Sequence, residues 1–432
     1  MAENIKTLPR ARSAALPRPG RLSLGRTLAL SLPFAWISIF NAVLDNGLPV
    51  ILTDPVADGG LALNDTLKGV VMALDNILGL FLLPLFGWLS DRSRSKWGKR
   101  TPLALAGGVL AALLWGGTGA ALGMHANGRS AQWLFLLLLT GALAAVAFSR
   151  PASLAILPDF TPLPHRRTAN AVTQIVSIVC TVVGILLISV FAPLGYDRLF
   201  FATAALMLLL VLLFLLTVKE RRWSPAGPAE DGDGQAAVEG DAKKKRSRVL
   251  LLVSLFFFYV SYNGLVSSLS VYAKDVLGLD KSQFILPQAL TLAAAMAFAV
   301  PAALLAKRFR RKNLLLLGVG IMIAAFTLAG FQPALNPVMF LCFFFTGGGF
   351  AVALVNLYPY LLELSDAKKV GSATGIFNTV MTFAMVVTPI ASGWLSDHTP
   401  WGRRVLFPYC IAALALSFLF LLLISERKKA AV

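Results

Sequence analysis

The sequence is poor in charged residues, and this shortage excludes an ordinary soluble fold. Only 14% of its 432 residues are Asp, Glu, Lys or Arg, whereas 57% are hydrophobic. A soluble domain carries about 25% charged residues. The composition therefore indicates an integral membrane protein.

Cysteine and histidine are also scarce, with three of each. The cysteines Cys180, Cys342 and Cys410 all stand in apolar segments, so they form no disulfide framework. The histidines lie at loop edges and make no metal-ligand pattern. No phosphate-binding loop and no nucleophile turn occurs in the sequence. We therefore expect neither an enzyme nor a resident metal or cofactor.

Long apolar segments make up most of the chain. Each is near or above the ~20 residues that cross a bilayer, and backbone groups in lipid must be satisfied within a helix. The twelve segments are 27–52, 66–90, 101–124, 132–157, 168–192, 199–218, 249–273, 282–306, 313–332, 336–362, 371–395 and 404–424. The sequence therefore predicts an all-α protein with twelve transmembrane helices.

The net charge of +18 follows the loops and does not indicate a nucleic-acid partner. Lys and Arg concentrate in cytoplasmic loops of membrane proteins. With the N-terminus inside, the inner basic clusters are 92–100, 166–167, 243–248, 307–312, 368–369 and 427–429. This asymmetry predicts a multi-pass protein of the cell membrane with both termini in the cytoplasm. Arg403 and Arg404 are an exception on the outer side.

One internal segment, 220–248, is polar and too poor in apolar residues to fold by burial, so we expect a flexible cytoplasmic linker. It separates six apolar segments from six more, as in two pseudo-symmetric halves. The expected parts are a basic tail 1–26, a six-helix bundle 27–219, the linker 220–248, a second bundle 249–424 and a tail 425–432.

The most informative motif is the basic loop from Gly87 to Arg100, which lies between the second and third segments. It resembles the signature loop of the major facilitator superfamily, G-x-x-S-D-R-x-R-S-x-W-G-[KR]-R. This form occurs in the glycoside-pentoside-hexuronide cation symporters and the related sucrose transporters. The resemblance implies twelve transmembrane helices in two six-helix bundles, with alternating access to a central site.

The signature loop is interpreted as a cytoplasmic latch. Asp91 ends the second helix, where neighbouring basic groups can pair with it in one conformation and release it in another. The candidate latch residues are Gly87, Asp91, Arg92, Arg94, Gly98 and Arg100. Residues 393–397 repeat the letters of residues 87–91, G-W-L-S-D. Coincidence and an inverted structural repeat are both open as explanations.

Charged residues within the apolar segments are candidates for cation coupling or substrate binding, because they are costly in a membrane. Asp75 stands a third to halfway along the second segment and Asp45 near the outer end of the first. Asn76 and Asn41 accompany them. Each acid must be paired or protonated, which suits proton coupling, although a structural pair is the alternative.

Arg150 stands inside the fourth segment, ahead of the P-D-x-T-P sequence at 158–162. This arrangement resembles the turn between the fourth and fifth helices in the sucrose-transporter-like branch. Arg150 is expected to bind substrate, a carboxylate or the latch, unless it extends to the inner headgroups. Melibiose-type relatives carry two sodium-site acids on the second helix, at places that fall on Gly79 and Leu83 here. A proton is therefore expected in place of sodium.

Polar and aromatic residues in the second half could bind a sugar in a central cavity, although each could equally join two helices. They are Tyr259, Tyr262, Asn263, Gln288, Asn356 and Asn378. The resemblance to the major facilitator superfamily implies proton-coupled symport of a sugar or glycoside. The alternatives are an exporter or carrier of drugs or lysolipids, and a transport-inactive sensor or assembly factor on the same fold.

Overall fold

The computed structural model describes residues 23–92, 95, 98–124, 129–218, 220, 242–365 and 370–424. These residues form α-helices joined by short turns and 3-10 segments. The helices are α1 (Leu24–Asn46), α2 (Leu48–Thr53), α3 (Asp65–Arg92), α4 (Thr101–Gly123), α5 (Arg129–Phe160), α6 (Arg166–Phe191), α7 (Tyr196–Thr217), α8 (Ala242–Asp275), α9 (Leu286–Arg308), α10 (Arg311–Gly330), α11 (Pro337–Glu363), α12 (Val370–His398) and α13 (Leu406–Leu422). The 3-10 segments are η1 (Val56–Asp58), η3 (Leu163–His165) and η6 (Gly402–Val405).

Twelve helical spans in the described part of the chain are long and apolar enough to cross a membrane, which confirms the expected fold class. The first span joins α1 and α2, which meet at Gly47 ahead of Pro49. The last span joins η6 and α13. Each expected apolar segment corresponds to one of these spans.

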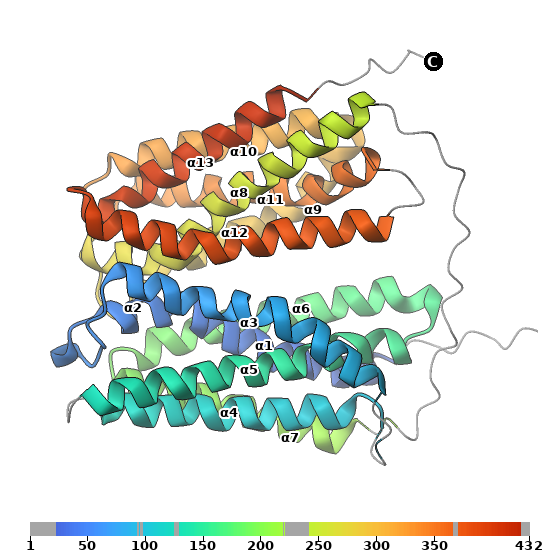
Figure 1. Ribbon diagram of the computed structural model, residues 1–432, viewed down its shortest axis with the longest axis vertical. Helices are drawn as coiled ribbons and strands as arrows, with labels where there is room; N and C mark the ends of the chain where they lie inside the picture. Colours follow the sequence, from blue (N-terminus) through green and yellow to red (C-terminus); the bar gives the residue numbers. More distant parts are fainter. Residues whose placement is uncertain are drawn as a thin grey trace, which may run out of the picture.

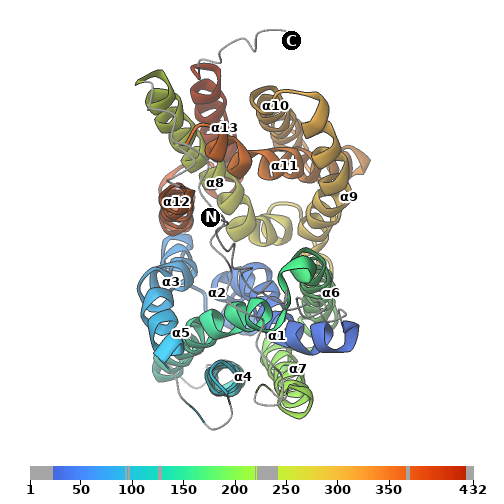
Figure 2. The same ribbon diagram turned by 90° about the vertical axis from the view of Figure 1, so that its right-hand side faces the viewer.

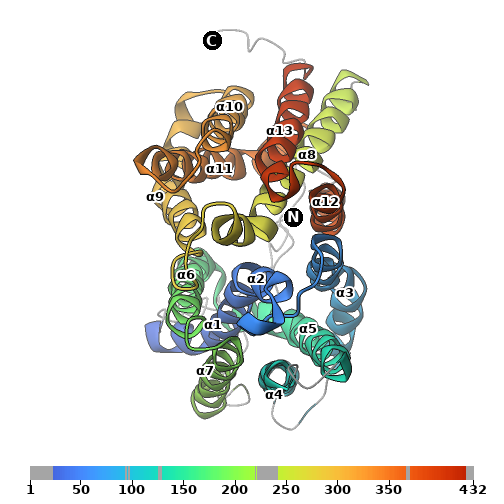
Figure 3. The ribbon, with the colours of Figure 1, turned by 90° about the vertical axis from the view of Figure 1, so that its left-hand side faces the viewer.

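The helices form two bundles, α1–α7 and α8–α13, that lie one below the other in Figure 1. Figure 2 and Figure 3 look along the helices from the two ends of the molecule. In both, α3 faces α12 across the boundary between the bundles. Both α1 and α2 contact α8 across the same boundary. Because α1 and α2 form one span, each bundle has six spans. Helix α6 of one bundle lies beside α9 of the other.

The two ends of the molecule differ in how closely the bundles approach. We name them the signature end, where α3 ends and α4 begins, and the opposite end, where α3 begins and α12 ends. At the opposite end α3 and α12 meet backbone to backbone. A Cβ on Gly69 would overlap the carbonyl oxygen of Pro389, and one on Gly393 would overlap that of Asp65. Towards the signature end the bundles diverge (Figure 1).

One expected boundary differs from the structure. Helix α8 begins at Ala242, so residues 242–248 are helical, although the sequence analysis assigned them to the linker. The apolar segment marks what lies in the bilayer, whereas Lys and Arg are good helix formers that extend the helix beyond it. Residues 221–241 lie outside the described residues, so the division at this linker stays a prediction.

Candidate functional site

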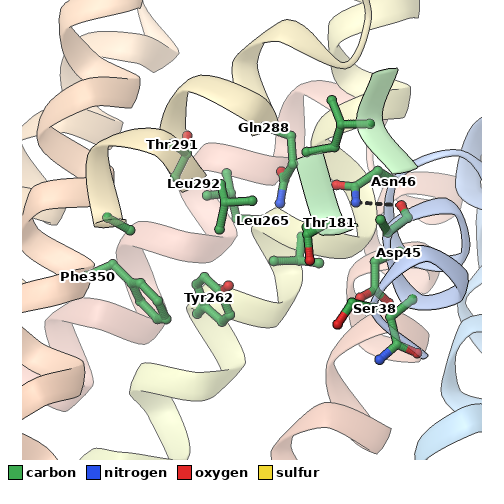
Figure 4. A pocket seen from close by; sticks show the side chains of 15 residues that line it. Ser38, Asp45, Asn46, Thr181, Tyr262, Leu265, Gln288, Thr291, Leu292 and Phe350 are labelled. Atoms are coloured by element: carbon green, nitrogen blue, oxygen red, sulfur yellow. Dashed lines mark hydrogen bonds between the residues drawn. The ribbon is translucent and has the colours of Figure 1, made fainter. Parts of the chain in front are cut away.

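A cavity of about 190 Å³ lies between the two bundles (Figure 4). Helices α1 and α6 line it on one side, and α8, α9 and α11 line it on the other. Its lining residues are Ser38, Asn41, Ala42, Asp45, Asn46, Thr181, Ile185, Tyr262, Leu265, Val266, Gln288, Thr291, Leu292, Ala295 and Phe350. Eight of these fifteen side chains carry a polar group, so the cavity suits a ligand that forms hydrogen bonds.

The α1 side of the cavity is polar. Ser38, Asn41 and Asp45 recur at helical spacing, which places them on one face of α1. Asp45 is half-buried and forms no hydrogen bond or ion pair with the described residues. Asn46 donates from Nδ2 to the carbonyl oxygen of Ala42 at 2.7 Å, and its buried Oδ1 has no partner among those residues. This wall therefore offers a carboxylate and a free amide oxygen.

The facing wall carries aromatic rings. Tyr262 on α8 stacks on Phe350 of α11, with ring centroids 3.9 Å apart and planes 10° from parallel (Figure 4). Phe258, one helical turn before Tyr262, lies parallel to Phe350 at 5.8 Å. Gln288 on α9 enters the same cavity, and its buried Oε1 has no partner in the described part of the chain. The second wall thus combines a flat apolar surface with an unpaired acceptor.

Arg150 of α5 reaches the edge of this cavity. Its Nη2 donates to Oδ1 of Asn41 at 3.3 Å. Asp45 is in electrostatic interaction with Arg150 and with Asp75 of α3. Asp75 and Asn76 are half-buried and do not line the cavity. The first bundle therefore groups two carboxylates and one guanidinium around the polar wall.

The polar residues expected in the second half are not all at the cavity. Tyr262 and Gln288 line it. Tyr259 is buried against Phe377, and Asn263 donates to the carbonyl oxygen of Met385 at 3.1 Å. Asn356 is buried, donates to the carbonyl oxygen of Val352 and accepts from Arg311, while Asn378 is exposed. Asn263 and Asn356 thus join or brace helices.

Two basic residues of the signature loop, Arg92 and Arg100, have partners within the first bundle. Arg100 is buried and donates to Asp159 from Nε at 2.9 Å and to Ser90 from Nη1 at 2.8 Å. The guanidinium of Arg92 lies 4.0 Å from the ring centre of Trp88. Gly98 has a φ of +124°, which suits the turn expected there.

Gly87 is the one remaining latch candidate whose surroundings the structure describes. A Cβ on Gly87 would lie 3.9 Å from the nearest atom, so no close approach needs glycine there in this conformation. The side chain of Asp91 and the whole of Arg94 lie outside the described residues. The pairing expected for Asp91 therefore stays a prediction.

Glu220 was missed by the sequence analysis because it stands at the start of the polar linker. Its carboxylate is buried and accepts from the backbone N–H groups of Lys99 (2.7 Å), Arg100 (3.1 Å) and Thr101 (2.8 Å). These are the unpaired donors at the beginning of α4, where a negative charge is favourable. A Cβ on Gly98 would overlap this carboxylate. The sequence signal that could have identified Glu220 is an acidic residue directly after an apolar span.

Five polar or aromatic cavity residues also escaped prediction: Ser38, Asn46, Thr181, Thr291 and Phe350. The spacing of seven between Ser38 and Asp45 could have identified Ser38 as a residue of the same helix face. Thr181, Thr291 and Phe350 stand in apolar segments that carry no distinguishing pattern. Only the packing of five helices brings them together.

Comparison with known proteins agrees with this architecture. The family model described as MFS/sugar transport protein matches residues 32–385. The search of curated proteins finds no match. Among solved structures, the chain is similar to a bacterial homologue of the human lysosomal transporter Spinster in an inward-facing, occupied conformation. That match has 16% identity and a TM-score of 0.68, and covers 93% of this chain and 95% of the other.

Two further structures give similar results. A peptide transporter, POT, in complex with sulfate has 16% identity and a TM-score of 0.67, covering 94% and 96% of the two chains. A point mutant of the nucleoside transporter NupG has 16% identity and a TM-score of 0.67, covering 92% and 100%. At this identity the matches establish the fold alone. Because the family model covers most of its length, the chain belongs to the MFS/sugar transport protein family and is a multi-pass secondary transporter of the major facilitator superfamily.

Proposed function

We propose that this protein carries a sugar or glycoside by symport with a proton, and that the substrate binds in the cavity between the bundles. The observation that supports this most is the pairing of two unlike walls. One carries Asp45 and Asn46, and the other carries the stacked rings of Tyr262 and Phe350. A sugar has hydroxyl groups for the first wall and an apolar ring face for the second.

The proton is proposed to bind at Asp45 or Asp75. A carboxylate in a membrane span needs either a cation or a proton, and neither acid has an ion-pair partner among the described residues. Arg150 lies in electrostatic reach of Asp45. Protonation of either acid would therefore change the negative charge near the Arg150 guanidinium. Because Arg150 also binds Asn41 in the polar wall, proton binding would be linked to that wall of the cavity.

We further propose that the signature end is cytoplasmic, because its loops hold most of the Lys and Arg. The close contact of α3 with α12 then lies on the outer side. On this orientation the structure corresponds to an inward-facing state, as does the Spinster homologue. Asp91 is proposed to stabilise the outward-facing state, so Asp91→Asn should slow turnover and leave the half-saturating substrate concentration nearly unchanged.

The alternative of a drug exporter or lysolipid carrier would be favoured by an apolar central cavity. The polar groups on both walls of this cavity support a sugar instead. A transport-inactive sensor would bind ligand without uptake. These alternatives are separable by transport measurements.

The test is uptake of radiolabelled mono- and disaccharides into proteoliposomes, with and without a pH gradient. If Asp75 carries the proton, Asp75→Asn should abolish uphill accumulation and leave counterflow exchange partly intact, because exchange moves no net proton. One proton moving down 100 mV gains about 2.3 kcal/mol, or roughly a 40- to 50-fold concentration ratio. Asp45→Asn is tested in parallel, and Asp197→Asn, at the edge of another pocket, is the matched control.

Each result has a defined meaning. Wild-type accumulation by the Asp75 variant together with failure of the Asp45 variant moves the coupling role to Asp45. Wild-type accumulation by both variants rejects proton coupling through these acids. Uptake of lysolipid but of no sugar would establish the lipid alternative, and saccharide binding without uptake would establish the sensor.

A further inference from the structure

At the opposite end of the molecule, the end of α12 forms hydrogen bonds with the beginning of α3. The carboxylate of Asp397 accepts hydrogen bonds from the backbone N–H of Asp65 at 3.1 Å and of Thr66 at 2.7 Å. It also accepts from the Thr66 hydroxyl at 2.5 Å. The first N–H groups of a helix lack partners within the helix, and a negative charge there is favourable. A residue of the second bundle therefore caps a helix of the first.

A second set of contacts holds the same junction. Asp65 accepts from Nζ of Lys68 at 2.7 Å, from Nε of Arg403 at 2.9 Å and from the hydroxyl of Ser396 at 3.0 Å. Arg403 also pairs with Asp275. These contacts explain the basic residue that departs from the charge rule on this side. Arg403 is held by two acids and joins the two bundles.

These charges suit a contact that must open. Desolvating an ion pair costs about as much free energy as its attraction returns, so a paired cluster that can rehydrate separates at little net cost. The glycines add close packing without apolar side chains. Gly69 and Gly393 bring the backbones of α3 and α12 together, as small residues do between membrane helices.

The α12 residues of this junction, Gly393, Ser396 and Asp397, belong to the second copy of G-W-L-S-D. Both copies end a long helix, and their tryptophans, Trp88 and Trp394, are each 52% exposed. In each copy a basic side chain one turn later lies on the ring: Arg92 at 4.0 Å and His398 with centroids 4.9 Å apart. The described parts of the two copies thus share a helix end and a contact between tryptophan and a basic residue, at opposite ends of the molecule.

We propose that Asp397 is the latch of a gate at the opposite end, and that it closes the cavity there by capping α3. Asp397 binds the backbone N–H groups of Asp65 and Thr66 and the hydroxyl of Thr66. Gly69 and Gly393 allow the two helices to pack closely. A secondary transporter must open each end in turn, so the cap has to break once in every cycle. This proposal concerns the gate and holds for any substrate or coupling ion.

The experiment measures distances between spin labels in the full-length protein in nanodiscs, with its native cysteines replaced. One label pair, at exposed positions Ala57 and Trp401, reports on the opposite end. A second pair, at exposed positions Thr168 and Arg308, reports on the signature end. Asp397→Asn should raise the ratio of open to closed molecules at the first pair about 2- to 10-fold. The lower part of that range is expected because Asp397 is exposed and its charge is screened.

Two more variants separate a latch from a general charge effect. Asp397→Lys places a cation at the N-terminus of α3 and should open the first pair further than Asn does. Asp91→Asn changes the same residue of the first G-W-L-S-D copy and should not open it. The proposal is wrong if Asp397→Asn and Asp397→Lys both fold and keep the wild-type distances. It is equally wrong if Asp91→Asn opens the first pair as much as Asp397→Asn.

Discussion

The ring of Tyr262 lies almost flat on the ring of Phe350, 3.9 Å from centroid to centroid, although the two stand on different helices. Phe258 also lies parallel to Phe350, with ring centroids 5.8 Å apart. The rings of Tyr262 and Phe350 give the C-terminal bundle a flat wall at the cavity, and Phe258 is buried behind it. The N-terminal bundle has no such surface among the described residues that line the cavity, and presents amide and carboxyl groups instead.

Phe350→Leu should weaken substrate binding and leave folding nearly unchanged, because the side chain stays apolar but loses its flat face. Aromatic contacts contribute about 0.5–1.5 kcal/mol beyond burial, so the half-saturating concentration should rise about 2- to 12-fold. Uptake kinetics in proteoliposomes measure it. Tyr259→Phe, away from the cavity, is the control and should behave as wild type. Equal substrate affinities in wild type and Phe350→Leu would remove the ring wall from the binding site.

Glu220→Ala should lower stability by about 0.5–2 kcal/mol, because it leaves three backbone donors at the start of α4 unpaired. Thermal unfolding in detergent measures the loss. Glu363→Ala is the matched control. Glu363 lies near the start of another helix but pairs with a side chain, that of Arg311, and is 56% exposed, so the expected change is about 0–1 kcal/mol. Equal melting temperatures for Glu220→Ala and wild type would contradict the capping role.

Gly349→Val should destabilise the second bundle by about 1–3 kcal/mol, because a Cβ there would lie 2.7 Å from the carbonyl oxygen of Gly318. Gly375→Ala is the control. A Cβ at Gly375 meets nothing within 4 Å, and alanine favours the helix. Melting temperatures should fall for the first variant and hold or rise for the second. The reverse order would contradict the packing of α10 on α11.

Gln235→Cys should be labelled by an impermeant thiol reagent only after the cells are opened, because the distribution of loop charges predicts that residues 220–248 are cytoplasmic. Position 235 lies outside the described residues, so the experiment tests topology alone. A variant without native cysteines provides the background. Labelling of intact cells would reverse the proposed orientation of both bundles.

The sequence alone determined the number of spans and the family. Apolar length has a direct physical meaning in a bilayer, so twelve segments predicted twelve spans. The signature loop is contiguous, and its order of residues carried the resemblance that the family match confirms. The apolar pattern did not predict that α8 begins at Ala242, because a helix can extend beyond the part that lies in the bilayer.

Tertiary structure decided which polar side chains act together. Asn263 and Gln288 are both polar residues in apolar segments, yet one braces a helix and the other enters the cavity. The role of each residue depends on how its helix is rotated and on how the two bundles dock. Local sequence spacing determines neither of these. The same holds for Asp397 and Thr66, which lie 331 residues apart in the chain. Only the packing of α12 against α3 makes them partners.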